Sequence, residues 1–260
     1  MRNSYVVLLL ILSLSASGAT YYVDPAGSNN NNGTAGSPWK TLAFACSKVK
    51  TSGDIIHLNT GTFIETSQSI LAAGVSIEGE GVNSVIQSRV GGSSFTILLT
   101  SSTQAANGNQ HISNIKMDGD NLTAYGAIRV AFRKNVEIYN CTFVNFNYYG
   151  VSFINGEPPN TYATGNKFYD NTVTNCSGWY SGNRGCLEIQ GQDGMLIYNN
   201  NMSTEGRKNT GDVIYAVEGF LKNVKIYNNT FVKDYYPGTS HNDFALEFWN
   251  CQGGVEIYDN

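Results

Sequence analysis

Side chains able to carry acid–base chemistry recur at one position of a repeated sequence pattern. Each lies in a short apolar stretch and alternates with residues expected to point inward, as Ile128 and Val130 flank Arg129. The side chains that we expect to point outward in this way are Arg129, Ser152, Glu188, Tyr215 and Glu247. Carboxylates and phenols can move protons, and an arginine can stabilise a developing negative charge. Neighbouring loops are expected to add Arg184, Asp193, Asp212, His241, Asp243 and Trp249.

The elements that position these side chains follow from an internal repeat. Five segments share one apolar-Tyr-Asn/Asp pattern: 136–140, 166–170, 195–199, 224–228 and 255–259. Their central apolar residues, at 138, 168, 197, 226 and 257, are separated by 30, 29, 29 and 31 positions. Fainter copies centre on Ile77 and Ile112. A unit of this length cannot bury its own apolar face, so the repeat predicts stacked coils.

Composition indicates that the coils are built from strands and turns. Asn (31) and Gly (28) occupy 59 of 260 positions, only 14% of residues are charged, and 12% are aromatic. Asn and Gly are poor helix formers, and this aromatic content argues against disorder. A helical bundle and a doubly wound α/β fold are therefore excluded. A β-propeller blade needs a longer repeat, and no leucine-rich signature is present. The formal net charge of −4, with scattered Lys and Arg, gives no basic stripe for nucleic acid.

Two kinds of residue in the repeat are expected to be structural. Asn or Asp occupies the last position of each segment, at 140, 170, 199, 228 and 259. Such residues tolerate left-handed turns, and stacked amides can form hydrogen bonds from coil to coil. The five cysteines include no CxxC pair and are odd in number. A Cys176–Cys186 bridge would suit an oxidising compartment, but nothing else in the sequence supports it.

The N-terminal residues predict export. Arg2 precedes an apolar run from Tyr5 to Leu14, and the small residues Ser17 and Ala19 suit cleavage after Ala19. This pattern is typical of a secretory signal peptide and is too short for a membrane span. We expect 1–19 to be the signal peptide, 20–75 an N-terminal segment with a cap, and 76–260 the stacked coils. Because the sequence stops inside a repeat, we also expect it to be truncated at the C-terminus. No other apolar run approaches the length of a membrane span.

The first residues after the expected cleavage point resemble a known architecture. The resemblance lies in 21–25, Gly27, 32–34, 37–42, 53–56 and 61–63. These residues are similar to the N-terminal segment of secreted proteins of the pectin-lyase-like superfamily, especially pectate lyases and the alginate lyase and chondroitinase B group. The resemblance implies an all-β, single-stranded right-handed parallel β-helix with coils of about 30 residues. It also implies that residues near 40–49 form a short capping helix. Leu42, Ala45, Cys46 and Val49 lie on one side of that helix.

The resemblance implies action on a uronate-containing polysaccharide by β-elimination. This reaction needs a base, and a cation must stabilise the developing enolate. Candidate cations are Arg129, Arg184, Lys134 and His241, or calcium held by Asp212 and Asp243 with Glu188 or Glu247. Tyr215 would protonate the leaving oxygen. Arg184 and Trp249 would bind the polymer. No catalytic residue of the family can be carried over, because the sequence has no compact acidic cluster matching a known lyase calcium site.

Two further functions remain open at this stage. Glu188 and Glu247 are expected two coils apart, on the order of 10 Å at about 4.8 Å per coil. This is near the upper limit of the roughly 6.5–9.5 Å of an inverting glycosidase pair, although two solvated carboxylates would look the same. A non-catalytic glycan-binding or surface adhesin module is the other alternative. In each case we expect a secreted monomer, extracellular or periplasmic, whose partner is an extracellular polysaccharide.

Overall fold

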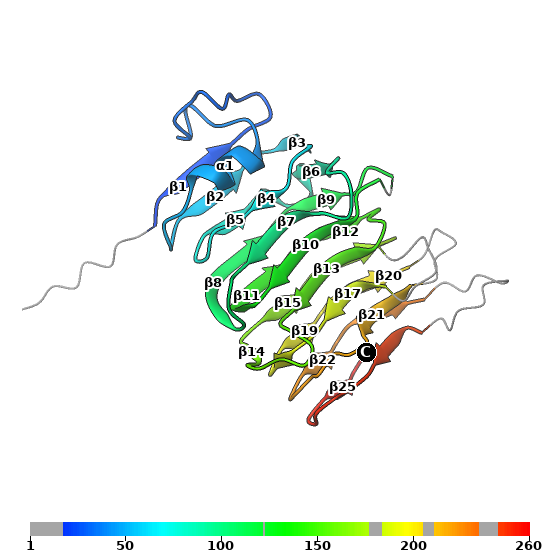
Figure 1. The fold of residues 1–260 in the computed structure, drawn as a ribbon. Helices are drawn as coiled ribbons and strands as arrows, with labels where there is room; N and C mark the ends of the chain where they lie inside the picture. The colour runs from blue at the N-terminus through cyan, green and yellow to red at the C-terminus, as the bar shows by residue number, and fades with distance from the viewer. Residues whose placement is uncertain (1–17, 122, 177–183, 205–210, 234–243) are drawn as a thin grey trace, which may run out of the picture.

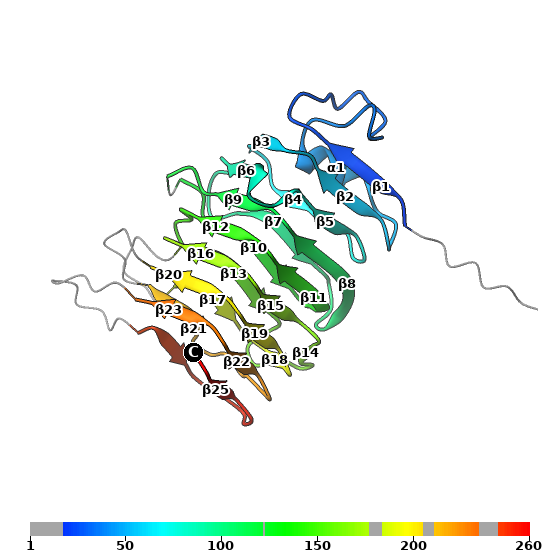
Figure 2. The ribbon, with the colours of Figure 1, turned by 180° about the vertical axis from the view of Figure 1, so that it is seen from behind.

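The computed structural model describes residues 18–121, 123–176, 184–204, 211–233 and 244–260. Almost all regular structure in these ranges is strand. Each named strand pairs in parallel with a strand of the preceding or following coil. Figures 1 and 2 show the coils stacked in chain order, from the blue N-terminal segment to the red strand β25. The predicted parallel β-helix is therefore confirmed, whereas its right hand and its coil length remain predictions.

Seven successive coils each contribute one strand to each of three long sheets, and β1 and β25 extend the first sheet at its two ends. The first sheet contains β1 (Thr20–Val23), β2 (Ile55–Leu58), β5 (Ser76–Glu78), β8 (Ala106–Ser113), β11 (Arg133–Tyr139), β15 (Lys167–Tyr169), β19 (Leu196–Tyr198), β22 (Lys225–Tyr227) and β25 (Glu256–Tyr258). The second contains β4 (Ser69–Ile70), β7 (Phe95–Thr100), β10 (Gly126–Ala131), β13 (Tyr149–Ile154), β17 (Gly185–Ile189), β21 (Asp212–Ala216) and β24 (Leu246–Phe248). The third contains β3 (Gly61–Glu65), β6 (Ser84–Ser88), β9 (Lys116–Asp118), β12 (Thr142–Val144), β16 (Thr172–Thr174), β20 (Asn201–Ser203) and β23 (Thr230–Val232). A small fourth sheet pairs β14 (Ala163–Thr164) with β18 (Gln192–Asp193).

The repeated apolar residues form the core between these sheets. Ile138, Phe168, Ile197, Ile226 and Ile257 are successive register partners in the first sheet. All but the last are fully buried. Large side chains from the other sheets, such as Phe143 and Phe153, fill the same core. Burying a side chain of this size stabilises a fold by about 1.5–3 kcal/mol, so stacking supplies what a single unit lacks.

The structure corrects the prediction for the Asn/Asp column. The predicted residues, at 140, 170, 199, 228 and 259, do adopt left-handed turns, with φ between 52° and 57°. However, the buried ladder of amides is formed by the residues that follow them, Asn171, Asn200, Asn229 and Asn260. In this ladder, Asn200 Nδ2 donates to Asn229 Oδ1 (2.9 Å) and to the Phe168 carbonyl (3.0 Å). Two adjacent asparagines therefore divide the two tasks that the sequence assigned to one.

The tyrosines of the repeat form a second ladder, on the outer face of the first sheet. Tyr139, Tyr169, Tyr198, Tyr227 and Tyr258 stack with ring centroids 4.8–5.2 Å apart and planes within 8° of parallel. This spacing is the strand spacing of the sheet, so each ring lies on the ring of the next coil.

The predicted capping helix is present and shorter than expected. Helix α1 (Leu42–Lys48) begins after Thr41, whose hydroxyl accepts a hydrogen bond from the Phe44 N–H (3.3 Å). Glu65 accepts hydrogen bonds from the Leu42 and Ala43 N–H groups at the same end. The helix covers the first coil with Leu42, Ala45 and Cys46, which are buried.

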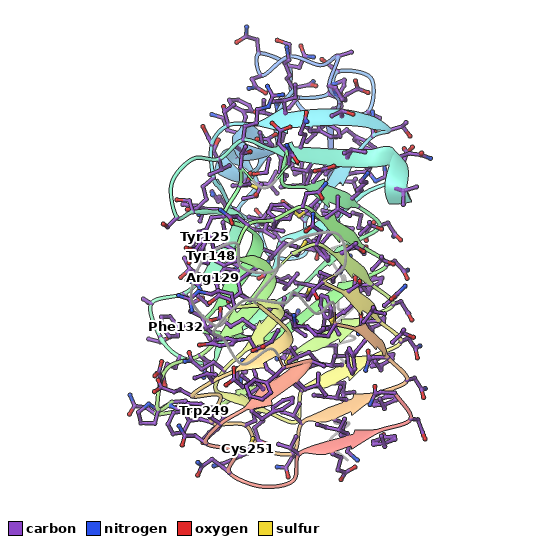
Figure 3. The ribbon with its side chains drawn as sticks, turned by 90° about the vertical axis from the view of Figure 1, so that its right-hand side faces the viewer. Tyr125, Arg129, Phe132, Tyr148, Trp249 and Cys251 are labelled. Carbon is purple, nitrogen blue, oxygen red and sulfur yellow. The ribbon has the colours of Figure 1, made fainter. Side chains whose placement is uncertain are left out.

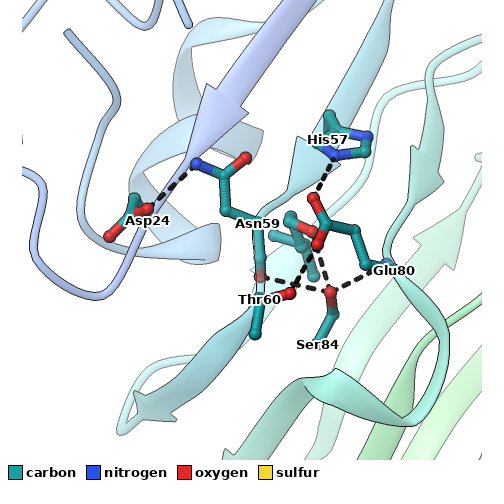
Figure 4. A network of polar contacts seen from close by, with 7 residues as sticks. Asp24, His57, Asn59, Thr60, Glu80 and Ser84 are labelled. Atoms are coloured by element: carbon teal, nitrogen blue, oxygen red, sulfur yellow. Dashed lines mark hydrogen bonds and ion pairs between the residues drawn. The ribbon is translucent and has the colours of Figure 1, made fainter. Parts of the chain in front are cut away.

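A polar network joins the N-terminal segment to the first coils (Figure 4). Asn59 donates to Asp24 (2.9 Å), and Glu80 accepts from Thr60 and contacts the His57 ring (3.4 Å). Ser84 follows η1 (Gly81–Asn83), a single 3-10 turn, and donates to the Leu58 carbonyl (2.9 Å). These contacts fix the segment that carries the family resemblance.

The remaining structural predictions have mixed outcomes. All five cysteines are free thiols, and only Cys251 is exposed, so the Cys176–Cys186 bridge is not formed. Most of the predicted signal peptide lies outside the described residues. Within the described ranges, no helix is long and apolar enough to cross a membrane.

Candidate active site on the second sheet

The register of the second sheet aligns the five residues of the predicted outward column. Arg129 pairs with Ser152, Ser152 with Glu188, Glu188 with Tyr215, and Tyr215 with Glu247. The five side chains therefore leave five successive strands, β10, β13, β17, β21 and β24, at the same level. They lie on the outer face of the sheet, opposite the face from which Leu187 and Ile189 pack into the core.

A second set of side chains stands three residues before this column, at the start of the same strands. Phe95 and Tyr149 are both register partners of Gly126, and Gly185 is the partner of Asp212. The Phe95 ring lies over Gly126, where a Cβ would meet it at 2.5 Å. In a strand that alternates strictly, residues three positions apart point to opposite faces. Here two successive residues point inward, Cys186 and Leu187 in β17 and Val213 and Ile214 in β21, so the residue before each pair faces outward like the column. We call this break in the alternation the corner.

An ion pair links the first and third residues of the column. Arg129 Nη2 lies 3.2 Å from Glu188 Oε2, and its Nε donates to Ser152 Oγ (3.3 Å). Ser152 Oγ in turn donates to the same Glu188 oxygen. The Arg129 guanidinium also lies over the Phe95 ring, 4.4 Å from its centroid. Glu188 is thus oriented by two donors on the coils before it.

Aromatic rings surround the second arginine, Arg184, which immediately precedes β17. Its guanidinium lies 5.6 Å from the centroid of Tyr148 and 5.9 Å from that of Tyr149. Tyr148 stacks on Tyr125 at 4.5 Å. Figure 3 shows Tyr125, Tyr148 and Arg129 together along one side of the solenoid. Burial would lower the pKa of Arg184, but the hydroxyls of Tyr149, Tyr215 and Tyr125 and the Glu188 carboxylate raise it, so Arg184 stays cationic.

The two tyrosines beside Arg184 are held as neutral phenols. Burial, followed by the charge of Glu188, raises the pKa of Tyr149. Burial also raises the pKa of Tyr215, Arg184 lowers it in part, and Glu188 and Glu247 raise it further. With a raised pKa, each phenol keeps its proton at neutral pH, so it has a proton to donate and is not available as a base.

Asp212 and Glu247 form a buried carboxyl pair at the end of the column. Asp212 is 1% exposed and Glu247 5%. Within the described residues, Asp212 Oδ2 and Glu247 Oε2 have no hydrogen-bond donor. Burial, followed by the neighbouring Glu247, raises the pKa of Asp212 to about 8. The pair therefore keeps a proton at neutral pH.

The pair also corrects two predictions. Asp212 was expected on a loop, whereas it lies in β21. Glu247 was expected to point into solvent, whereas the register that places it in the column also buries it. For Asp212 the difference follows from the two successive inward residues Val213 and Ile214, which turn the start of β21 towards the column.

The other predicted site residues are dispersed. Asp193 lies in β18 of the small fourth sheet and accepts a hydrogen bond from Asn223 (2.8 Å). Lys134 lies in β11 of the first sheet. Trp249, 54% exposed, follows β24 near the C-terminal end of the solenoid (Figure 3). His241 and Asp243 lie outside the described residues.

The predicted calcium site is incomplete in the described part of the chain. Calcium takes six to eight oxygen ligands in proteins. Asp212 and Glu247 supply carboxyl oxygens, and no group of three or more metal-ligating His, Cys, Asp or Glu side chains occurs among the described residues. The third expected ligand, Asp243, is one of the residues not described, so calcium binding remains a prediction.

Sequence reasoning missed Phe95 and the position of Tyr149. The sequence feature that could have revealed them is a constant spacing: each lies three residues before a residue of the outward column. The second set is 95, 126, 149, 185 and 212, and the column positions are 98, 129, 152, 188 and 215. A strand that alternates throughout would hide this offset, since it would send these residues inward.

No protein-family model matches the sequence, and a search of curated proteins finds no match either. Solved structures do match. ORF18 of Geobacillus virus E2 aligns over 92% of this chain and 53% of its own, with a TM-score of 0.58 and 12% identity. Tailspike gp49 of the Acinetobacter baumannii bacteriophage Fri1, described as a capsular polysaccharide depolymerase, aligns over 95% and 48%, with a TM-score of 0.57 and 11% identity. The Dettilon tailspike gp208 aligns over 91% and 46%, with a TM-score of 0.56 and 15% identity.

These matches define a class by fold. The chain spans about half the length of the solved structures it matches. It is a parallel β-helix solenoid. This is the architecture that its N-terminal segment predicts, and the solved tailspike structures share it.

Proposed function

We propose that this protein is exported and cleaves a uronate-containing polysaccharide by β-elimination on the outer face of the second sheet. One observation carries the proposal. A glutamate, a tyrosine whose raised pKa keeps it a neutral phenol, and two arginines lie along four successive coils, where a polymer running along the solenoid would meet all of them. These are the base, the acid and the cations that β-elimination needs.

The roles follow from the contacts. Arg184 and Arg129 would bind the uronate carboxylate and stabilise the enolate that develops from it. Glu188 would take the proton from the carbon next to that carboxylate, and the electron pair left behind would form the carbon–carbon double bond. The bond to the glycosidic oxygen would break, and Tyr215, the register partner of Glu188, would protonate that oxygen. Tyr125 and Tyr148 would line the path of the polymer, and Trp249 would contact it further along.

Two further points support a carbohydrate substrate. Tailspike gp49, which shares the fold, is described as a capsular polysaccharide depolymerase. The outer face also combines aromatic rings with charged and hydroxyl groups, a mixture suited to sugars. We further propose that calcium, held by Asp212 and Asp243, contributes to substrate binding, and that the protein acts as a monomer.

The test is an ultraviolet assay for unsaturated uronate products. The chain from Thr20 is incubated with alginate, pectate and chondroitin, each with and without calcium. New absorbance with one polymer, lost in Glu188→Gln, is the expected result. If a folded protein yields no absorbance with any of the three, the proposal of β-elimination on these polymers is wrong.

A second candidate is glycoside hydrolysis, and the Asp212–Glu247 pair favours it. A carboxyl group protonated at neutral pH is suited to act as a general acid. Glu188 lies two coils from Glu247, about 10 Å at the strand spacing of a sheet, and would activate water as the base. New reducing ends without ultraviolet absorbance would establish hydrolysis. Saturable polymer binding without any product would instead support a glycan-binding module.

A further inference from the structure

A pocket of about 530 Å³ lies on the first sheet and shares no residue with the site on the second sheet. Its lining includes Asn109, His111, Asn135, Glu137, Tyr139 and Lys167. These residues come from three successive coils. The volume is in the range of roughly 300–1,000 Å³ that is typical of ligand sites.

The pocket arises from a step in strand length. Strands β8 and β11 are eight and seven residues long, whereas β15, the next strand of the sheet, has three. The pairing of β8 with β11 also shifts register between Lys134 and Val136. The two long strands therefore begin earlier than β15, and the chain before β15 contacts β11 through Asn166, whose side chain accepts from the Val136 N–H (2.9 Å) and donates to the Arg133 carbonyl (3.0 Å). The pocket lies at this step, where Gly165 at φ +70° leads into β15.

The wall behind the pocket is firmly held. Gln110, 5% exposed, donates to the Val75 carbonyl (2.8 Å) and accepts from Arg133 (2.8 Å). Arg133 is also buried and donates to the Leu71 carbonyl (3.0 Å). A fixed wall lowers the entropy cost of ordering the site when a ligand binds.

The charges of the lining are balanced. Lys167 Nζ lies 2.9 Å from Glu137 Oε1, and the other oxygen of Glu137 accepts from the Tyr169 hydroxyl (3.0 Å). His111 Nε2 lies 2.7 Å from Glu78 Oε1. Because Lys167 and His111 each have a carboxylate partner, the pocket carries little net charge with which to attract a free ion.

The lining still offers many hydrogen bonds and no open aromatic face. No hydrogen bond within the described part of the chain engages the Asn109 side chain, which is exposed. The Lys167 ammonium keeps donors beyond the one used by Glu137. Tyr139, by contrast, is covered by Tyr169 at 4.9 Å on one side and by the tilted His111 ring at 5.8 Å on the other. An apolar ligand would therefore find little surface, whereas a hydroxyl-rich one would find both donors and acceptors.

We propose that this pocket binds a neutral saccharide unit, as a non-catalytic site on a different face from the second-sheet site. Hydroxyl groups of the sugar would bind Asn109, Asn135, Glu137 and Lys167. The inference does not rest on the proposed cleavage activity, because it uses other residues on another sheet.

The test is binding of cello-, xylo- and galacto-tetraose to the intact chain, by calorimetry and by NMR of the histidine rings. The chain has three histidines, so the His111 ring is a local reporter. We expect saturable binding of at least one probe, with a shift of the His111 signals. Glu137→Gln and Lys167→Met should each weaken binding about tenfold or more, as the loss of a charge-assisted hydrogen bond does. Asn109→Ala, an exposed change that leaves the fold intact, should weaken it less.

A matched control is available two coils further along. Lys225 and Glu256 form the same kind of ion pair (3.3 Å) in the same column of the first sheet, outside the pocket. Lys225→Met and Glu256→Gln should leave binding unchanged, as should Glu188→Gln on the second sheet. The inference is overturned if none of the probes saturates, if binding moves a histidine other than His111, or if pocket and control variants lose affinity equally.

Discussion

Asp212 and Glu247 bring two buried carboxyl groups together from neighbouring coils, and the consequence is a pH-dependent stability. In the unfolded chain Asp212 releases its proton near its usual pKa of 3.8, whereas the folded protein keeps the proton up to about pH 8. Between these values the unfolded state binds fewer protons, so the free energy of unfolding falls as the pH rises. Above about pH 8 this contribution no longer changes.

Asp212→Asn should remove that dependence. The variant should gain thermal stability relative to the parent as the pH rises from 4.5 to 9, because an amide pays no cost for ionising in a buried place. Thermal unfolding midpoints at several pH values measure the effect. Asp193→Asn, on the fourth sheet, is the control and should show no such trend. A difference between Asp212→Asn and the parent that is constant across the range would contradict the assignment.

Tyr215 is the residue whose proposed role depends most on a single atom. Tyr215→Phe keeps the ring and removes the hydroxyl, so it should lower kcat by about 10²–10⁴ while KM changes little. Tyr198→Phe, in the ladder of the first sheet, makes the same chemical change elsewhere and should leave turnover intact. Equal activities of the two variants would remove Tyr215 from the mechanism.

At the scale of the element, the asparagine ladder separates two neighbours with different tasks. Asn200 is 2% exposed. Its Oδ1 accepts hydrogen bonds from the backbone N–H and the side-chain Nδ2 of Asn171, and its Nδ2 donates to the Phe168 and Tyr198 carbonyls. Asn200→Ala should leave several buried groups unsatisfied, at about 1–3 kcal/mol each. Asn199 is exposed at φ +57°, a conformation that glycine also adopts. Asn199→Gly should therefore change stability by roughly 0.5 kcal/mol or less.

Urea denaturation of both variants checks this prediction. The expected order is a large loss for Asn200→Ala and a small change for Asn199→Gly. A reversed order would mean that the hydrogen bonds of the buried amide ladder do not contribute most to holding neighbouring coils together.

The element scale also shows why the sequence predicted the strands better than the site. Alternation around Ile128 and Val130 was sufficient to place Arg129, Ser152 and Glu188 in one column, since strands β10, β13 and β17 repeat it. It could not place Asp212, because two successive inward residues, Val213 and Ile214, turn the chain at a corner that depends on packing. Nor could it assign the amide ladder, since adjacent asparagines carry equal signals for a turn and for a buried hydrogen bond.

At the scale of the whole molecule, the repeat and the N-terminal resemblance predicted the architecture, because both are properties of many coils. A pocket that needs unequal strands in neighbouring coils is invisible to a repeat, which reports only what the coils share.

The calcium site proposed at Asp212 and Asp243 predicts that stability depends on calcium. If calcium binds Asp212 and Asp243, adding it should raise the thermal unfolding midpoint and a chelator should reverse the rise. Asp212→Asn should abolish the response, whereas a rise that persists in this variant would place the ion elsewhere.

The two proposed sugar-binding faces should cooperate only on long substrates. A polymer that reaches from the first-sheet pocket to the second-sheet site gains effective concentration at the second contact, whereas a tetramer is too short to occupy both. Glu137→Gln should therefore raise KM for the polymer, leave kcat unchanged and leave the kinetics of a tetramer unaltered. Glu256→Gln, on the first sheet outside the pocket, should alter none of these values. A change in kcat, or an equal effect on polymer and tetramer, would mean that the substitution disturbs the catalytic face and not a separate contact, because binding that is the same in the ground and transition states alters KM alone.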